Sequence, residues 1–273
     1  MSNVETRLEC ALRAAAEASS LILSYYQLSG LEVESKRDES PVTVADRGAE
    51  QLMRERILEN FADDTVCGEE FPDWHGSSGF RWILDPIDGT KAFIHGVPLF
   101  GTLIGIESAG QMVAGVCQFP ALDEVVYAAQ GRGAWWKVGT RAATPARVSL
   151  RSDLSGARLV FTEPSFWKRL GRFEIMQELS DQVGISRGWG DCFGHMMVAT
   201  GRAEIAVDPQ MSPWDIAALI PILREAGGYC GDWRGQESLT GGDGVSVNAA
   251  LKERVLGILG KVPALAEIST GAA

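Results

Sequence analysis

The sequence predicts a mixed fold, α+β in its first half and α/β in its second, and three observations lead to it. Residues 4–28 carry apolar side chains at helical spacing. Residues 97–129 hold successive strand-like segments with turn signals between them, and consecutive strands of one meander favour an antiparallel sheet. From residue 158 on, short apolar segments alternate with helical ones, which is typical of an α/β unit.

In the first half we expect two helices and then a series of short strands. Ser29-Gly30 ends the first helix, because this pair favours a turn. In chain order, the predicted elements are a helix at residues 4–28, a helix from residue 46 to about residue 60, a short strand closed by Cys67-Gly68-Glu69-Glu70, a Gly/Ser-rich loop at 71–80, a buried strand at 82–84, strands at 97–107, 112–119 and 124–129, and a hairpin at 131–136.

In the second half we expect strands and helices in alternation. Pro221 is predicted to kink the last helix, because proline lacks an N–H group and clashes one turn back. Gly227-Gly228 is predicted to cap that helix. In chain order, the predicted elements are strands at residues 158–162, 185–189 and 204–208 and helices at 167–183, 192–200 and 214–226.

The composition excludes several classes of protein. The chain has 273 residues, of which 25 are basic and 36 acidic, and its net charge is −11. No basic face can dominate such a chain, which argues against a nucleic-acid partner. No apolar run reaches the roughly 18 residues that span a membrane, and the charged N-terminal segment does not match a signal peptide. The five cysteines form no Cys-x-x-Cys pair, so we expect reduced thiols and a cytoplasmic protein.

The most specific motif is Asp85-Pro86-Ile87-Asp88-Gly89-Thr90, at the end of a buried apolar strand. Two carboxylates there can share a hard cation such as Mg²⁺. The backbone N–H groups of Gly89 and Thr90 can hold an anion beside that cation. A phosphate ester bound to Mg²⁺ needs both features. The competing interpretation is a proline-containing turn capped by aspartate.

Three other motifs carry carboxylates at element ends, and each has an ordinary structural explanation. Gly68-Glu69-Glu70 is also consistent with a solvated turn. Asp46, in Thr43-x-x-Asp46, is also consistent with a helix cap. Asp215, after Pro213-Trp214, is also consistent with a carboxylate favoured by the helix dipole.

Together these motifs resemble the inositol-monophosphatase superfamily, over residues 43–228. The resemblance rests on Gly-Glu-Glu at 68–70, Asp-Pro-Ile-Asp-Gly-Thr at 85–90, Trp-Asp-x-Ala-Ala at 214–218 and Glu-Ala-Gly-Gly at 225–228. Three further segments are similar to the histidinol-phosphate phosphatase branch: Asp-Gly-Thr-Lys-Ala-Phe at 88–93, Gly-Asp-Cys-Phe at 190–193, and the helix containing Pro221. The resemblance implies a layered αβαβα sandwich, as in fructose-bisphosphatase, and a homodimer.

The resemblance also implies an activity and a set of site residues. The activity is Mg²⁺-dependent hydrolysis of histidinol phosphate to histidinol and phosphate, a step of histidine biosynthesis, with two or three Mg²⁺ ions. The implied metal ligands are Glu69, Asp85, Asp88, Asp215 and the Ile87 carbonyl. Glu69, Thr90 and Asp46 would activate the attacking water, Gly89 and Thr90 would bind phosphate, and Glu70 would orient the ligands. Converging carboxylates repel one another, so such a cluster needs cation charge.

The alcohol half of the substrate leaves alternatives open. Asp191 and Asp208 flank its expected position and suit an ammonium group, whereas Asp191 is equally consistent with a plain helix cap. Lys91 either approaches the phosphate or is solvated. His75, His95 and His195 lie outside the motifs, and we interpret them as structural or surface residues.

Residues 140–155 are the candidate domain boundary. We expect residues 1–145 to form an α+β domain with the antiparallel sheet and most metal ligands, and residues 146–273 to form an α/β domain with Asp215 and the alcohol pocket. The alternatives to a histidinol-phosphate phosphatase are an inositol-1-phosphate or related sugar-alcohol phosphatase, a 3′-phosphonucleotide phosphatase, and a non-catalytic protein that binds metal or phosphate.

Overall fold

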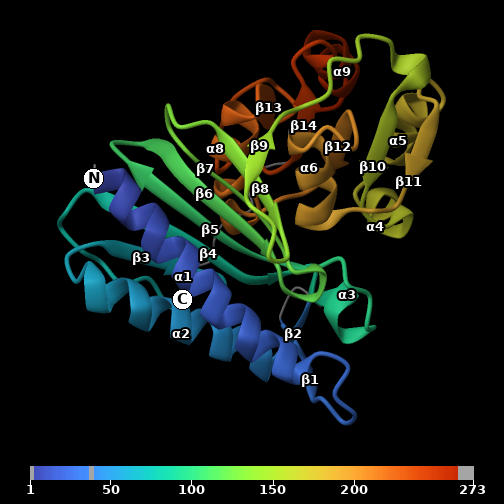
Figure 1. Ribbon diagram of the computed structural model, residues 1–273. Coiled ribbons are helices and arrows are strands. Elements are labelled where there is room, and N and C mark those ends of the chain that lie inside the picture. The colour runs from blue at the N-terminus through green and yellow to red at the C-terminus, as the bar shows by residue number, and fades with distance from the viewer. Residues whose placement is uncertain (1–2, 37–39, 264–273) are drawn as a thin grey trace.

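The computed structural model describes residues 3–36 and 40–263, which form five alternating layers (Figure 1). Helices α1 (Asn3–Tyr25) and α2 (Val44–Asn60) cover one face of a seven-stranded sheet. Helices α6 (Asp191–Ala199), α7 (Pro213–Ala217) and α8 (Leu219–Glu225) lie between this sheet and a five-stranded one. Helices α4 (Pro164–Arg169), α5 (Phe173–Ser180) and α9 (Lys252–Leu259) form the outer layer on the second sheet. The predicted αβαβα sandwich is confirmed.

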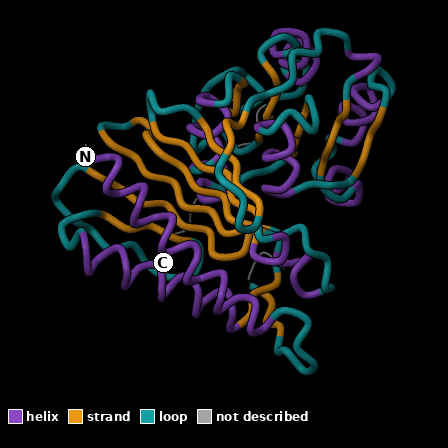
Figure 2. The backbone as a smooth tube through the Cα atoms, in the orientation of Figure 1, coloured by secondary structure: helices purple, strands orange, loops and turns teal. Residues whose placement is uncertain are grey.

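The seven-stranded sheet is the predicted meander, with one parallel strand added at its edge (Figure 2). Its strands are antiparallel in sequence order from β4 to β9, and β3 pairs with β4 in parallel. The strands are β3 (Thr65–Gly68), β4 (Phe80–Asp88), β5 (Gly101–Ser108), β6 (Gln111–Phe119), β7 (Glu124–Ala129), β8 (Ala134–Val138) and β9 (Thr144–Ala146).

The five-stranded sheet is mixed, in the order β11-β10-β12-β14-β13. β10 pairs in parallel with β11 and β12, whereas β14 is antiparallel to β12 and β13. The last two strands and α9 follow the final predicted element, so the sequence interpretation did not include them. The strands are β10 (Arg158–Phe161), β11 (Ile185–Arg187), β12 (Ile205–Asp208), β13 (Gly228–Gly231) and β14 (Gly244–Asn248).

The remaining elements are short. β1 (Val33–Ser35) and β2 (Pro41–Thr43) form an antiparallel pair. α3 (Thr90–Ile94) follows β4 directly, and two 3₁₀ turns span Pro120–Leu122 and Leu154–Gly156.

The prediction of one helix over residues 167–183 is wrong. α4 ends at Arg169 and α5 begins at Phe173. Gly171 lies between them with a φ of 67°, a left-handed conformation that ends a helix and that glycine adopts without steric cost. A lone glycine inside an apolar pattern gave too weak a signal for this break.

The predicted helix at 214–226 is divided in two. α7 ends at Ala217 and α8 begins at Leu219, so the helical hydrogen-bond pattern is interrupted at Ala218, which itself keeps helical φ and ψ angles of −71° and −31°. Pro221 has no N–H group to donate to the Ala217 carbonyl one turn back, which accounts for the interruption. Gly227, with a φ of 87°, follows α8 as the predicted glycine cap.

A glycine pair on the large sheet allows this divided helix to lie close to it. Gly105 and Gly115 are paired across β5 and β6. A Cβ atom on Gly115 would lie 2.2 Å from the Ala218 carbonyl oxygen, and one on Gly105 would lie 2.7 Å from the Ala217 Cβ atom. Larger residues at either position would therefore push the helix off the sheet. This close approach brings the first turn of α7, with Asp215, next to β4.

The two sheets come from separate parts of the chain, residues 65–146 and residues 158–248. Because α8 packs against strands of both sheets, the halves share one interior. The division into domains at 1–145 and 146–273 stays a prediction. Within residues 3–36 and 40–263, no helix combines the length and the apolar character that a bilayer crossing needs.

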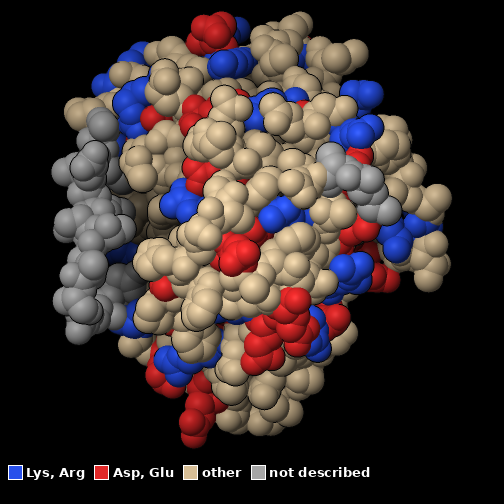
Figure 3. Space-filling view, turned by 90° about the vertical axis from the view of Figure 1, so that its left-hand side faces the viewer, with Lys and Arg blue, Asp and Glu red and all other residues tan. Residues whose placement is uncertain are grey.

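Charged side chains of both signs are interspersed on the face that lies to the left in Figure 1. Figure 3 shows no continuous basic area there. This distribution agrees with the net charge of −11. The absence of a nucleic-acid partner stays a prediction.

Candidate active site

A bulge at the end of β4 brings Asp85 and Asp88 to one side of the sheet. Residues three apart in a regular strand point to opposite faces. Here Asp85 is opposite Leu103 and Asp88 is opposite Gly101, so β4 has one residue more than its partner strand between these pairs. Such an extra residue re-aims the following side chain. Pro86 lies within the bulge, where it lacks an N–H group for the ladder, and its carbonyl instead accepts a bond from the Thr102 hydroxyl at 2.9 Å.

The first turn of α7 supplies the third carboxylate, Asp215. Pro213 begins this helix, a position where its missing N–H group costs nothing. The Ser212 N–H group donates to Asp215 Oδ2 at 2.7 Å, which fixes the side chain and occupies one of its two oxygens. Asp215 therefore also stabilises the start of α7, in line with the structural explanation offered for it from the sequence. Its other oxygen is still available to bind a metal ion.

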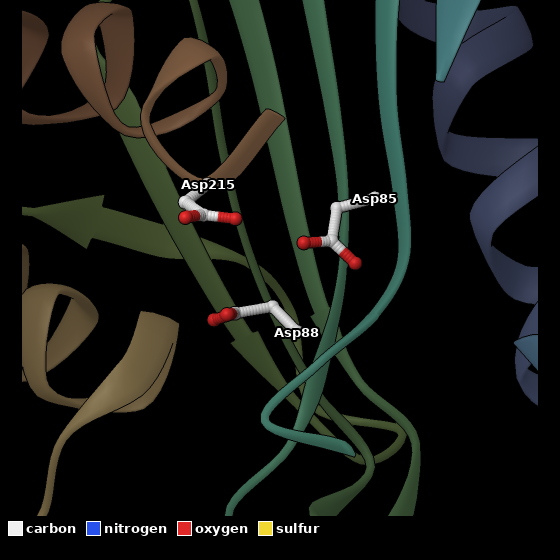
Figure 4. Close-up of side chains that lie close together, drawn as sticks. All are labelled: Asp85, Asp88 and Asp215. Carbon is white, nitrogen blue, oxygen red and sulfur yellow. The ribbon is translucent and has the colours of Figure 1, made fainter. Parts of the chain in front are cut away.

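Asp85, Asp88 and Asp215 form one acidic cluster, with ligand atoms within 4.8 Å of one another. Figure 4 shows their carboxylates converging from β4 and from α7. Burial, followed by repulsion from neighbouring carboxylates, raises the pKa values of Asp85 and Asp215 far above the ordinary range. Asp85 is 2% exposed, and its Oδ1 atom is buried without a hydrogen-bond partner among the described residues. Such a cluster could hold a metal ion.

Glu69 and Glu70 lie after β3 and share one lysine. Lys36 Nζ is 2.6 Å from Glu69 Oε1 and 2.5 Å from Glu70 Oε1. Burial raises the pKa of Glu69 to about 7, although Lys36 opposes the shift and Glu70 adds to it. Burial lowers the pKa of Lys36, and the two glutamates outweigh this effect and raise it. The sequence interpretation missed Lys36, which lies in the polar stretch after the first helix.

A buried carboxylate holds the backbone of this turn. Glu50 of α2 accepts hydrogen bonds from the N–H groups of Glu70, at 2.8 Å, and Phe71, at 3.3 Å. A Cβ atom on Gly68 would lie 2.2 Å from Glu50 Oε1, so the glycine of the Gly-Glu-Glu motif makes room for this carboxylate. The sequence interpretation missed Glu50, whose position inside a helix gave no signal.

Asp46 and Thr90 approach each other beside the cluster. Thr43, and not Asp46, is the N-cap residue of α2. Asp46 completes a capping box, because its Oδ2 atom accepts bonds from the Thr43 N–H group at 2.8 Å and the Thr43 hydroxyl at 2.6 Å. The Thr90 hydroxyl lies 3.4 Å from Asp46 Oδ1 and 2.9 Å from the Ile87 carbonyl oxygen. Burial raises the pKa of Asp46. The structure therefore pairs these residues, and their role in activating water stays a prediction.

Gly89 turns the chain from β4 into α3. Its φ of 85° is left-handed, and the Leu99 carbonyl oxygen would lie 3.1 Å from a Cβ atom at this position. A side chain there would be strained and crowded. The turn directs Gly89 and Thr90 to the cavity beside the acidic cluster, which both residues line.

Asp191 is not a helix cap. Gly190 occupies the N-cap position of α6, and no side chain makes a cap hydrogen bond there. Asp191 has a φ of 54°, a left-handed conformation that is uncommon outside glycine but that aspartate adopts more readily than most residues. Burial, followed by repulsion from Asp88 and Asp208, raises the pKa of Asp191. The next N–H group, of Cys192, donates to Asp88 Oδ2 at 2.5 Å.

Asp208, at the end of β12, forms a hydrogen bond with a buried histidine. Its Oδ2 atom lies 2.8 Å from His195 Nε2, and the Ser246 hydroxyl lies 2.7 Å from His195 Nδ1. His195 is buried, in agreement with its interpretation as a structural residue, but its contact with Asp208 was not expected. His75 and His95 are exposed. Lys91 is more than half exposed, lies 3.2 Å from Glu163 and lines the same cavity as Gly89 and Thr90, so both of its alternatives stay open.

A cavity of 510 Å³ joins these parts. Glu69, Asp88, Thr90, Asp191, Asp208 and Asp215 all line it. The structure therefore brings together residues from both sheets and from α3, α6 and α7. Asp85 and Asp46 lie behind this lining, because both are buried.

The comparisons agree with this geometry. Residues 3–264 match the pattern of the Inositol monophosphatase family. The chain belongs to the inositol monophosphatase family. A histidinol-phosphatase of Chlorobaculum parvum is 47% identical over 254 residues, which cover 93% of this chain and 96% of that protein. A histidinol-phosphatase of Mycobacterium tuberculosis is 39% identical, over 91% of this chain and 96% of that protein.

Solved structures show the same fold. The extragenic suppressor protein suhB from Bartonella henselae matches with a TM-score of 0.85 and 28% identity, over 94% of this chain and 100% of that one. The resemblance predicted from the acidic motifs is therefore confirmed, and the inositol monophosphatase family accounts for nearly the whole chain.

Proposed function

We propose that this chain is a Mg²⁺-dependent phosphomonoesterase that hydrolyses histidinol phosphate to histidinol and phosphate. The observation that carries the proposal is the convergence of Asp85, Asp88 and Asp215 at a cavity that Asp88 and Asp215 line and behind which Asp85 lies. Family membership supports the reaction class, and the two relatives named histidinol-phosphatase support the substrate. Hydrolysis of this ester is a step of histidine biosynthesis.

The residues of the acidic cluster fit Mg²⁺, which takes carboxylate, carbonyl and water oxygens. Asp85 Oδ1 has no other partner among the described residues, and unpaired buried carboxylates are costly without a cation. Glu69, Asp85, Asp88, Asp215 and the Ile87 carbonyl would hold two or three ions, and Glu70, next to Glu69, would help to orient the ligands. When bound, the ions supply charge that stabilises the attacking and leaving oxygens of the displacement.

The chain's own residues would arrange the other reactants. Gly89 and Thr90, at the start of α3, would donate backbone N–H groups to the phosphate oxygens. Thr90 and Asp46 would orient the attacking water, with Glu69 as a second acceptor for its protons. The water oxygen forms a bond to phosphorus, the bond from phosphorus to the ester oxygen breaks, and that oxygen leaves as the alcohol after gaining a proton. This step needs no covalent enzyme intermediate.

The alcohol half would lie on the α6 side of the cavity. Asp191 and Asp208 both line it there, and histidinol phosphate carries an ammonium group that a carboxylate can bind. Inositol phosphate offers only neutral hydroxyl groups. Asp191 and Asp208 therefore favour an alcohol that carries a positive charge, because hydrogen bonds between charged groups are stronger than those between neutral groups.

Two wider expectations accompany this proposal. The resemblance supports a homodimer, and the five free cysteines support a reducing compartment such as the cytoplasm. An inositol-1-phosphate or sugar-alcohol phosphatase is the main alternative, because it would use the same cluster. A 3′-phosphonucleotide phosphatase or a non-catalytic binding protein is less well supported, since every carboxylate that the resemblance implies is present.

Release of phosphate from a panel of esters tests the proposal. The protein is first treated with a chelator, then assayed on histidinol phosphate, inositol 1-phosphate and a 3′-phosphonucleotide, with and without Mg²⁺. We expect release only with Mg²⁺ and the highest kcat/KM on histidinol phosphate. Release from none of the esters would reject the enzymatic function, whereas a preference for inositol 1-phosphate would reject only the substrate.

A further inference from the structure

A buried hydrogen-bonded chain leads from the second sheet to the cavity. The Ser246 hydroxyl contacts His195 Nδ1 at 2.7 Å, and His195 Nε2 contacts Asp208 Oδ2 at 2.8 Å. His195 and Ser246 are fully buried, and Asp208 is 5% exposed. Only Asp208 of the three lines the cavity. The chain therefore connects the interior of the protein to one wall of the site.

The three residues come from three packed elements. His195 belongs to α6, Asp208 ends β12, and Ser246 lies in β14, and these two strands are paired. α6 packs against both strands. Because both ring nitrogens have partners, the imidazole is fixed in one orientation. Asp208 is in turn fixed by the ring.

The two oxygens of Asp208 have different surroundings. Oδ2 is occupied by the histidine, whereas Oδ1 is buried and has no hydrogen-bond partner among the described residues. The ring nitrogen that faces this carboxylate donates to it, and the Ser246 hydroxyl contacts the other ring nitrogen, so both polar atoms of the ring are used within the protein. The free oxygen therefore calls for a donor from a ligand, preferably a cationic one.

Within residues 3–36 and 40–263, no lysine or arginine forms an ion pair with Asp208, whose ion-pair partner is His195. Three other carboxyl groups, those of Asp88, Asp191 and Asp215, lie close enough to interact electrostatically with it. Lys91, the lysine that lines the same cavity, is paired with Glu163.

We propose that His195 is a positioning residue for substrate choice: it holds Asp208 so that its free oxygen receives the ammonium group of the leaving alcohol. This inference rests on the proposed function, because it assigns the contact to that substrate. The Ser246 hydroxyl holds the ring in place through its contact with Nδ1, on the side of the ring away from Asp208. His195 itself touches neither the substrate nor the reacting atoms.

Two amide substitutions separate this role from simple packing. The amide nitrogen of glutamine can take the place of Nε2, so His195→Gln keeps a donor for Asp208. The shorter asparagine reaches only the place of Nδ1, so His195→Asn keeps a contact for Ser246 and leaves Asp208 unheld. Both variants replace the ring by a smaller polar group. The exposed His75→Gln serves as a control outside the site.

The readout is the ratio of kcat/KM for histidinol phosphate to kcat/KM for inositol 1-phosphate, with saturating Mg²⁺. We expect His195→Asn to lower this ratio about tenfold or more, mainly through a higher KM for histidinol phosphate. We expect His195→Gln to recover most of the ratio, and His75→Gln to leave it unchanged. In an Asp208→Asn background, His195→Asn should cause no further loss of the ratio.

Equal loss on both substrates in His195→Asn, or equal ratios for the Asn and Gln variants, would overturn the proposal. If His195→Asn does not fold, as judged by circular dichroism, Ser246→Ala tests the same chain with the ring retained. A folded Ser246→Ala protein with an unchanged ratio would also overturn it. Absence of wild-type activity on histidinol phosphate would instead reject the proposed function, so the two failures are distinguishable.

Discussion

Lys36 Nζ lies 2.6 Å from Glu69 Oε1, so an ammonium group stands beside one of the proposed metal ligands. The same nitrogen contacts Glu70. Neither partner is more than about a quarter exposed, so solvent screens this contact less than an ordinary surface ion pair. Without metal, Lys36 balances part of the charge of the site. A cation that binds at Glu69 must therefore compete with it.

Replacement of Lys36 should strengthen metal binding. In Lys36→Met the competing charge is lost, and we expect the Mg²⁺ concentration for half-maximal phosphate release to fall by roughly threefold to tenfold, the effect of one nearby charge in a partly solvated site. Arg56→Met removes an equal charge from an exposed ion pair and serves as the control. A higher Mg²⁺ requirement in Lys36→Met would show that the lysine assists binding.

Bound Mg²⁺ should stabilise the folded protein, because it relieves repulsion within the acidic cluster. Thermal unfolding of the wild type is expected to show a midpoint that rises with Mg²⁺ concentration. Asp215→Asn removes one charge, so its metal-free midpoint should be higher than that of the wild type and its Mg²⁺-dependent rise smaller. An equal Mg²⁺ response in both proteins would exclude Asp215 as a ligand.

Foreign cations should inhibit turnover. The family resemblance implies inhibition by Li⁺, which would replace a Mg²⁺ ion, and by Ca²⁺, whose larger and looser coordination does not suit the same carboxylates. Initial rates at fixed Mg²⁺ with increasing Li⁺ or Ca²⁺ measure this effect. Activity that is indifferent to both ions, or that survives exhaustive chelation, would contradict Mg²⁺ dependence.

Asp191 is suited to a substitution that changes charge alone. Asparagine tolerates the left-handed backbone that Asp191 adopts, so Asp191→Asn should keep the local fold. If this acid binds the ammonium group, the variant loses about 10-fold or more in kcat/KM on histidinol phosphate and far less on an uncharged ester. Equal losses on both esters would remove Asp191 from the substrate contacts.

The parts of the fold that could be predicted are those with strong local signals. The strand that ends in Asp85-Pro86-Ile87-Asp88 contains the apolar run Trp82-Ile83-Leu84, and the glycine cap after α8 lies where expected. The break at Gly171 was missed because a lone glycine inside an apolar pattern is a weak signal. The last two strands were missed because the sequence interpretation ended before them. Gly105 and Gly115 are isolated glycines within strand segments. The sequence alone therefore did not reveal that a helix packs on this pair.

In the candidate site, too, some residues could be predicted from the sequence and others could not. The spacing of one motif was enough to select Asp85 and Asp88 as candidate cation ligands, and the family resemblance added Asp215, which lies close to both. Lys36, Glu50 and His195 could not be selected, because each acquires its role from a partner more than ten residues away in sequence. The sequence also left Asp191 between two interpretations, and its backbone conformation excludes the helix cap.

Phosphate release by Asp85→Asn tests the central claim most directly. Asp85 is the most buried carboxylate of the acidic cluster, its Oδ1 atom lacks any partner among the described residues, and a neutral amide would hold a divalent cation less well than a carboxylate. Histidinol phosphate is supplied at saturating Mg²⁺ to wild type and variant, and circular dichroism establishes that both are folded. We predict turnover by the wild type and none detectable in the folded variant. Mg²⁺-dependent turnover by Asp85→Asn at a rate near that of the wild type would contradict the assignment of the metal site.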